Sequence, residues 1–227
     1  FTGIDTALPF IIGAAVLAIA TVPIFFVKDE NIEGEDDDPI SVIGFIKKAP
    51  ILLIAVGMFA IIDAANLSFL PVYGVKKGMD QATASLALTA FIIGNTVLQF
   101  PIGWLADHFR KRWVMAGCGV VTACASALIP LSFETWAFWP LLTIAGAASA
   151  GIYTVSLAEL GDRFSGHELV TGTASFSTTW GLGALLGSLI AGWSLQSFGP
   201  DGLPYSMALI FALFLLVMVT REVRKSP

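Results

Sequence analysis

The chain has 227 residues, of which 56% are hydrophobic and 13% charged, and its mean hydropathy is +0.82. Soluble domains of ordinary composition carry about 25% charged residues, so this composition excludes an ordinary soluble protein and predicts an integral membrane protein. The formal net charge of −5 says little about partners, because seven of the seventeen acidic residues lie in one stretch, Asp29–Asp38. Nothing in the sequence indicates a nucleic acid partner, a cofactor or a metal site.

Seven apolar runs follow one another along the chain, each near the roughly 20 residues that a helix needs to cross a bilayer. They predict an all-α membrane protein with seven transmembrane helices. Most connections after the second run are short, which favours a compact bundle. The runs are Leu8–Val27, Ile51–Tyr73, Ala84–Gly103, Trp113–Leu131, Trp136–Leu157, Val170–Trp193 and Leu203–Thr220.

The long connection after the first run has two parts. Asp29–Asp38 has the composition of a solvated linker, although an acidic run could also bind a partner or a cation. Ile40–Lys48 is typical of a short helix at the membrane interface, with two lysines at its end.

Lysine and arginine predict the orientation in the membrane, because these residues gather in cytoplasmic loops. Loops on one side hold ten of the twelve bases, and Lys76 and Lys77 lie on the other side. The majority side, which includes the C-terminus, is therefore predicted to be cytoplasmic, with Phe1 outside. We expect a bacterial-type plasma membrane. The ten bases are Lys28, Lys47, Lys48, Arg110, Lys111, Arg112, Arg163, Arg221, Arg224 and Lys225.

The loop between the third and fourth runs reads Gly-Trp-Leu-Ala-Asp-His-Phe-Arg-Lys-Arg, residues 103–112. Gly103 could let the backbone turn, Asp107 could cap the following helix, and Arg110, Lys111 and Arg112 could face anionic headgroups.

This loop resembles the signature of the major facilitator superfamily, G-x-L-A-D-[R/K]-x-G-[R/K]-[R/K]. His108 and Arg110 depart from that pattern, so the turn made by the second glycine of the signature is not supported here. Six positions match: Gly103, Leu105, Ala106, Asp107, Lys111 and Arg112.

Proteins of this superfamily resemble two six-helix bundles joined by a long cytoplasmic loop. The seven runs fit the sixth to twelfth family helices, which implies a fragment of a longer protein. Residues 1–27 would be the last helix of a truncated N-terminal bundle, residues 28–50 the linker and interfacial helix, and residues 51–227 the C-terminal bundle. The missing bundle and the lipid bilayer would then be partners.

Polar residues are concentrated in the second, third, fifth and sixth runs, the ones that line the substrate cavity in the family. Asp63 is the only ionisable residue near the middle of a run. Such residues usually mark a pathway or a proton relay, although a packing role is the alternative. Asn66, on the same face as Asp63, and Asn95, Gln99 and Tyr153 could contact substrate or bind neighbouring helices.

Three charged residues follow at the cytoplasmic end of the fifth run: Glu159, Asp162 and Arg163. With the loop at 103–112 they could form the charge cluster that closes a cytoplasmic gate, as the resemblance suggests, or they could be solvated helix ends. In the sixth run, the spacing of Gly183 and Gly187 indicates close helix packing. Trp180 is interpreted as a packed residue, with a place in the cavity as the alternative.

The predicted function is secondary active transport of a small-molecule substrate by alternating access, with protons as a second candidate partner. A seven-helix receptor-like or structural membrane protein is the alternative. An enzyme is not expected, because only Asp63 could do acid–base chemistry at depth. The substrate, its direction of movement and the coupling ion cannot be read from the sequence.

Overall fold

The computed structural model describes residues 8–22 and 42–223, which form helices and short connections without a strand. The acidic stretch Asp29–Asp38 lies outside the described residues. The helices are α1 (Leu8–Thr21), α2 (Val42–Lys48), α3 (Pro50–Lys76), α4 (Gln81–Val97), α5 (Gln99–His108), α6 (Lys111–Ser132), α7 (Phe138–Arg163), α8 (Gly166–Ser197) and α9 (Gly202–Val223).

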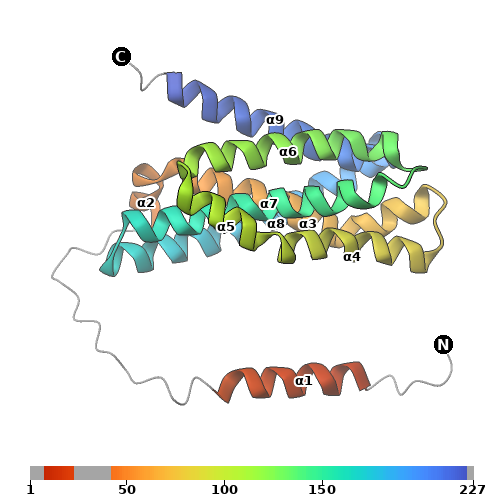
Figure 1. Ribbon diagram of the computed structural model, residues 1–227, viewed down its shortest axis with the longest axis horizontal. Helices are drawn as coiled ribbons and strands as arrows, with labels where there is room; N and C mark the ends of the chain where they lie inside the picture. The colour runs from red at the N-terminus through yellow and green to blue at the C-terminus, as the bar shows by residue number, and fades with distance from the viewer. Residues whose placement is uncertain (1–7, 23–41, 224–227) are drawn as a thin grey trace. The chain divides into compact units, whose positions relative to one another are not determined.

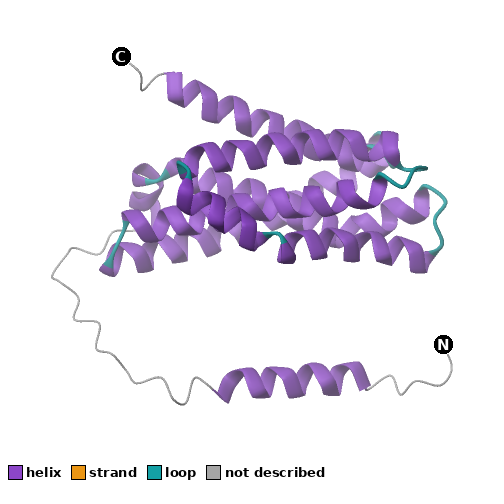
Figure 2. Cartoon of the chain, in the orientation of Figure 1, coloured by secondary structure: helices purple, strands orange, loops and turns teal. Residues whose placement is uncertain are grey.

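The chain divides into two compact units, Phe1–Asp36 and Asp37–Pro227. In the first unit the structure describes α1, which has 14 residues, so the end of the predicted run Leu8–Val27 falls outside the described residues. In the second unit α3 to α9 form a bundle of long helices joined by short loops (Figures 1 and 2).

The second unit confirms the predicted all-α membrane fold. Five of its helical stretches are long and apolar enough to cross a membrane: α3, α4 together with α5, α6, α7 and α8. The apolar part of α9, Gly202–Met218, is shorter. Within the bundle α3 packs on α8, and α7 packs on both α4 and α6.

Glycines allow two of these helix pairs to approach closely. A Cβ added at Gly94 of α4 would overlap the backbone of Thr143 in α7, and one added at Gly146 of α7 would overlap Phe91 in α4. A Cβ added at Gly183 or Gly187 of α8 would likewise lie too close to the backbone of α3, at Gly57 and Ile61 respectively. The predicted packing role of the Gly183–Gly187 spacing is therefore confirmed.

The third predicted run is broken at Leu98 into α4 and α5. Pro101 explains the break, because proline lacks the N–H that would bond to the carbonyl group of Val97 and its ring collides with that carbonyl. Gln99 and the first part of the loop at 103–112 therefore lie in α5, beyond the break.

The short helix predicted over Ile40–Lys48 is observed as α2, and it is anchored on the bundle. Phe45 is fully buried, with its ring 5.0 Å from that of Phe164. Lys48 Nζ lies 2.5 Å from Glu168 Oε1 at the start of α8. Both contacts hold α2 against the α7–α8 connection.

Candidate functional site

Asp63 lies inside the bundle on α3, where its side chain is only 8% exposed. Asn95 of α4 donates a hydrogen bond from Nδ2 to Asp63 Oδ1 over 3.1 Å. The two residues are 32 positions apart in the sequence, and the packing of α3 on α4 brings them together. This bond satisfies one carboxylate oxygen and fixes the position of the acid.

Asp63 and Asn95 line a cleft of about 480 Å³. Its walls come from α3, α4, α7 and α8, the helices that correspond to the four predicted cavity-lining runs. Tyr153 of α7 also lies here, with its ring 5.3 Å from that of Phe59. The lining residues are Phe59, Asp63, Asn95, Tyr153, Phe176, Ser177 and Trp180.

The structure does not bring Asn66 into this cleft. Its side chain is buried and donates to the carbonyl oxygen of Ile62 over 2.9 Å, one turn earlier in α3. It lies beside Tyr73 and Ser126 in a separate, much smaller void of about 10 Å³. A spacing of three residues leaves two side chains about 60° apart around a helix, and here that rotation is enough to separate their neighbours.

Gln99 also points elsewhere. Its Nε2 donates to the carbonyl oxygen of Ala147 over 3.4 Å, and its Oε1 accepts from the Thr154 hydroxyl over 2.6 Å. Both partners belong to α7, whereas Asn95 contacts α3. Asn95 and Gln99 therefore bond to different neighbouring helices, and Leu98, where α4 gives way to α5, lies between them.

Several cleft residues were missed by the sequence analysis. Phe59, Phe176 and Ser177 have no sequence feature that separates them from other aromatic residues and serines in the apolar runs. Trp180 was interpreted as a packed residue, yet it is 40% exposed and lines the cleft. Its position one helical turn after Phe176 on α8 could have indicated a shared aromatic face.

The signature loop differs from its predicted local structure. Gly103 and Asp107 lie inside α5, and the chain turns at Phe109 and Arg110 instead. Arg110 occupies the N-cap position of α6 and makes no side-chain capping bond there. The predictions that Gly103 makes the turn and that Asp107 caps the next helix are therefore wrong, since α5 continues to His108.

Charged residues around this turn do form ion pairs. Lys111 at the start of α6 pairs with Asp162 near the end of α7. Arg163 Nη1 lies 3.1 Å from Glu159 Oε1, one turn away on α7. The first pair connects two helices and holds the signature loop against the end of α7. Arg112 lies beside Lys111 and is half-buried.

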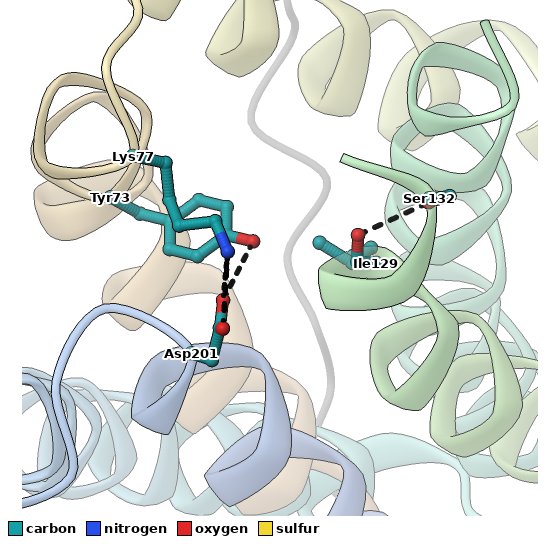
Figure 3. A network of polar contacts seen from close by, with 5 residues as sticks. All are labelled: Tyr73, Lys77, Ile129, Ser132 and Asp201. Atoms are coloured by element: carbon teal, nitrogen blue, oxygen red, sulfur yellow. Dashed lines mark hydrogen bonds and ion pairs between the residues drawn. The ribbon is translucent and has the colours of Figure 1, made fainter. Parts of the chain in front are cut away.

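The C-terminal end of α3 carries a second polar cluster, which no sequence feature predicted (Figure 3). Tyr73 donates its hydroxyl to Asp201 Oδ1 over 3.3 Å, and Lys77 Nζ donates to Asp201 Oδ2 over 3.1 Å. The Lys77 ammonium also lies 5.2 Å from the centre of the Phe133 ring. These contacts tie the end of α3 to the start of α9.

Relatives with a similar sequence match all or nearly all of this chain, but only part of their own length. An uncharacterized MFS-type transporter, YfkF, of Bacillus subtilis strain 168 is 25% identical over 224 residues, which cover 95% of this chain and 57% of the relative. The uncharacterized MFS-type transporter YcaD of Escherichia coli strain K12 / DH10B is 25% identical over 228 residues, covering 100% of this chain and 58% of YcaD. The chain thus spans a little over half the length of these relatives.

A solved structure shares the fold. The crystal structure of an auto-inhibited POT family peptide transporter matches 77% of this chain and 37% of its own chain, with a TM-score of 0.63 and 18% identity. The sequence model of the Major Facilitator Superfamily matches residues 52–227, which include the whole helical bundle from α4 onward and almost all of α3. The chain belongs to the Major Facilitator Superfamily.

Proposed function

We propose that residues 51–227 are the C-terminal bundle of a secondary transporter that moves a small solute by alternating access. The observation that carries this proposal is the cleft around Asp63. A buried carboxylate, an amide and a half-buried tyrosine meet there on three helices that are long and apolar enough to cross a membrane. Polar groups at membrane depth are retained where they face protein, water or a solute.

The complete transporter needs a second bundle, because alternating access is a rocking motion of two bundles around a shared site. The matched relatives extend well beyond the matched region, which agrees with such a protein. In this proposal residues 1–27 are the last helix of the N-terminal bundle and residues 28–50 connect the bundles. The cleft around Asp63 is then one wall of the solute pathway.

Proton coupling is assigned to Asp63. Asp63 is the one carboxylate among the described residues that line the cleft. It is buried, and Asn95 holds it in place with a hydrogen bond. The carboxylate accepts a proton when the pathway is open to one side and releases it to the other. The Asn95 amide can donate to Asp63 in either state, so the geometry survives the change of charge.

The ion pair between Lys111 and Asp162 is assigned to the cytoplasmic end of the bundle. This side is predicted to be cytoplasmic because its loops hold ten of the twelve bases. It keeps the signature loop attached to α7 while the bundle moves. Gly103, Asp107, Arg110 and Arg112 belong to this loop, and Glu159 and Arg163 form its border on α7.

Asp63→Asn in the complete transporter tests the coupling role, because asparagine keeps the shape and removes the charge. We expect accumulation driven by a proton gradient to be lost for every transported member of a solute panel, while passive exchange continues at saturating solute concentration. Glu134→Gln, an exposed change in the α6–α7 connection, is the matched control and should behave as the wild type.

The melting temperature separates this role from a packing role. If Asp63 only fixes helix packing, the variant melts at a lower temperature and the surviving protein still couples transport to the gradient. Normal concentrative transport by Asp63→Asn contradicts the coupling proposal directly.

A further inference from the structure

The cleft around Asp63 combines one negative charge with several aromatic rings. Asp63 is the only charged residue among those that line it, and Phe59, Tyr153, Phe176 and Trp180 supply four rings. Asn95 and Ser177 supply the remaining polar groups. Among the residues that the structure describes, no lysine, arginine or histidine lines the cleft, so the fixed charge of this lining is negative.

The carboxylate has room for a positively charged partner. Its Oδ1 accepts the bond from Asn95, and among the residues that the structure describes no ion pair involves Asp63. A buried carboxylate without a counter-charge is unfavourable in a low-dielectric environment. A cationic group of a solute placed beside the second oxygen, Oδ2, would remove that cost.

The aromatic rings of the cleft also favour a positively charged solute. Trp180 is 40% exposed and so presents part of its indole to the cleft, and Phe59 and Tyr153 form a neighbouring aromatic pair with ring centres 5.3 Å apart. The faces of aromatic rings carry negative charge density and attract cations, with tryptophan the strongest. The edges and faces of the same rings also bind the apolar part of an amphipathic molecule.

We propose that the solute is an amphipathic organic cation, with its charged group at Asp63 and its apolar part between Trp180 and the Phe59–Tyr153 pair. This inference rests on the proposed function and names the substrate class of the same site. A protonated Asp63 cannot pair with the cation, so proton and solute occupy the carboxylate in turn. The carboxylate repels organic anions from this wall of the pathway.

Two probes of the same shape and opposite charge test the proposal: tetraphenylphosphonium and tetraphenylborate. Equilibrium binding of each is measured on the complete transporter in detergent. We expect saturable binding of tetraphenylphosphonium, and at least tenfold weaker binding of tetraphenylborate. Equal binding of the two ions, or tighter binding of the anion, overturns the proposal.

Variants locate the bound cation. Asp63→Asn should weaken tetraphenylphosphonium binding at least tenfold, and Asp63→Glu, which keeps the charge, should recover most of it. Trp180→Ala should weaken binding about threefold to tenfold, as expected for loss of one cation–ring contact. Trp193→Ala is the matched control on α8, because Trp193 is 61% exposed and does not line the cleft.

If Asp63→Asn does not fold, the comparison of Asp63→Glu, Trp180→Ala and Trp193→Ala decides the outcome. Unchanged cation binding in Trp180→Ala, or an equal loss in Trp193→Ala, overturns the assigned position.

Transport measured in parallel separates this inference from the proposed function. Gradient-driven movement of neutral or anionic solutes without cation binding would overturn the substrate class and leave the transport proposal standing. Saturable cation binding without gradient-driven movement of any solute would overturn the transport proposal and support the binding site.

Discussion

Two hollows of similar size differ in chemistry. The cleft around Asp63 measures about 480 Å³, and a groove between α5, α6 and α7 measures about 530 Å³. The groove is lined almost entirely by apolar side chains such as Ile102, Trp113 and Val121, and no charged residue lines it. A groove of this kind can be filled by lipid chains in a bilayer, whereas a carboxylate and an amide cannot face hydrocarbon without a cost. Polarity therefore separates a candidate pathway from a lipid-facing surface better than volume does.

The largest effect is expected from a glycine substitution that compares helix packing in the walls of the two hollows. Gly94→Ala places a methyl group on the backbone of Thr143 and forces α4 away from α7, so it should destabilise the protein by about 3 kcal/mol or more. Gly117→Ala, in the wall of the groove, meets no atom within 4 Å and should be neutral or stabilising. Melting temperatures of the two variants in detergent provide the measurement. Similar values would show that the close α4–α7 packing does not support the cleft.

The next prediction moves a charge from one hollow to the other. Val121→Asp puts a carboxylate near the middle of α6, on a residue that is 42% exposed in the groove. Insertion should become about 2.5–3.5 kcal/mol less favourable, so the amount of membrane-inserted protein should fall sharply. Val121→Asn controls for polarity without charge and should reduce insertion less.

In the opposite direction, Asp63→Leu removes the charge from the cleft and should insert at least as well as the wild type. Undiminished insertion of Val121→Asp would mean that the groove faces water or protein, and the contrast between the two hollows would fail.

The polarity of whole runs predicted which helices form the cleft, and the isolated charge predicted Asp63. Individual directions could not be predicted in the same way. Gln99 bonds to α7 whereas Asn95 bonds to α3, and this choice of neighbour depends on how the helices pack. The sequence does not distinguish the aromatic residues of the cleft from those of the core. The packing of the helices alone determines that Phe59 is buried and Trp180 is exposed.

Ion pairs between segments that are distant in the chain could not be predicted from the sequence either. The charged residues near the signature loop were identified, but the pairing of Lys111 with Asp162 depends on the end of α7 lying beside the start of α6. Asp201 lies in a short connection, and no sequence feature predicts its contacts with Tyr73 and Lys77 at the end of α3.

A smaller effect is expected at the end of the bundle where the groove begins. Lys111 starts α6, which forms one wall of the groove, and its pairing with the exposed Asp162 should contribute no more than about 1 kcal/mol. A double-mutant cycle with Lys111→Gln and Asp162→Asn measures this coupling through melting temperatures at low and high salt. The coupling should decrease at high salt, because an exposed pair is screened. A coupling that salt does not change would contradict a solvent-screened pair and indicate a buried one.

The smallest effect concerns the first residues of the cleft wall. Asp80 caps α4, the helix that carries Asn95, and its carboxylate accepts hydrogen bonds from the Thr83 hydroxyl and the backbone N–H groups of Thr83 and Ala82. The bonds from Thr83 hold the pKa of Asp80 below its usual value near 3.8. By contrast, α6 in the groove wall begins without a side-chain cap.

A carboxyl group whose pKa is lower in the folded state stabilises that state at any pH above its usual pKa. This contribution is lost as the pH falls below 3.8 and through the lowered pKa of the folded state. In that range Asp80 binds a proton more readily in the unfolded chain than in the folded one, so acid favours unfolding. Asp80→Asn keeps a good capping residue and removes the titration. The wild type should therefore lose slightly more of its melting temperature than Asp80→Asn between about pH 6 and about pH 3. Equal losses would show that the α4 cap does not contribute to the acid sensitivity of the cleft wall, and a larger loss in Asp80→Asn would contradict the assigned direction of the pKa.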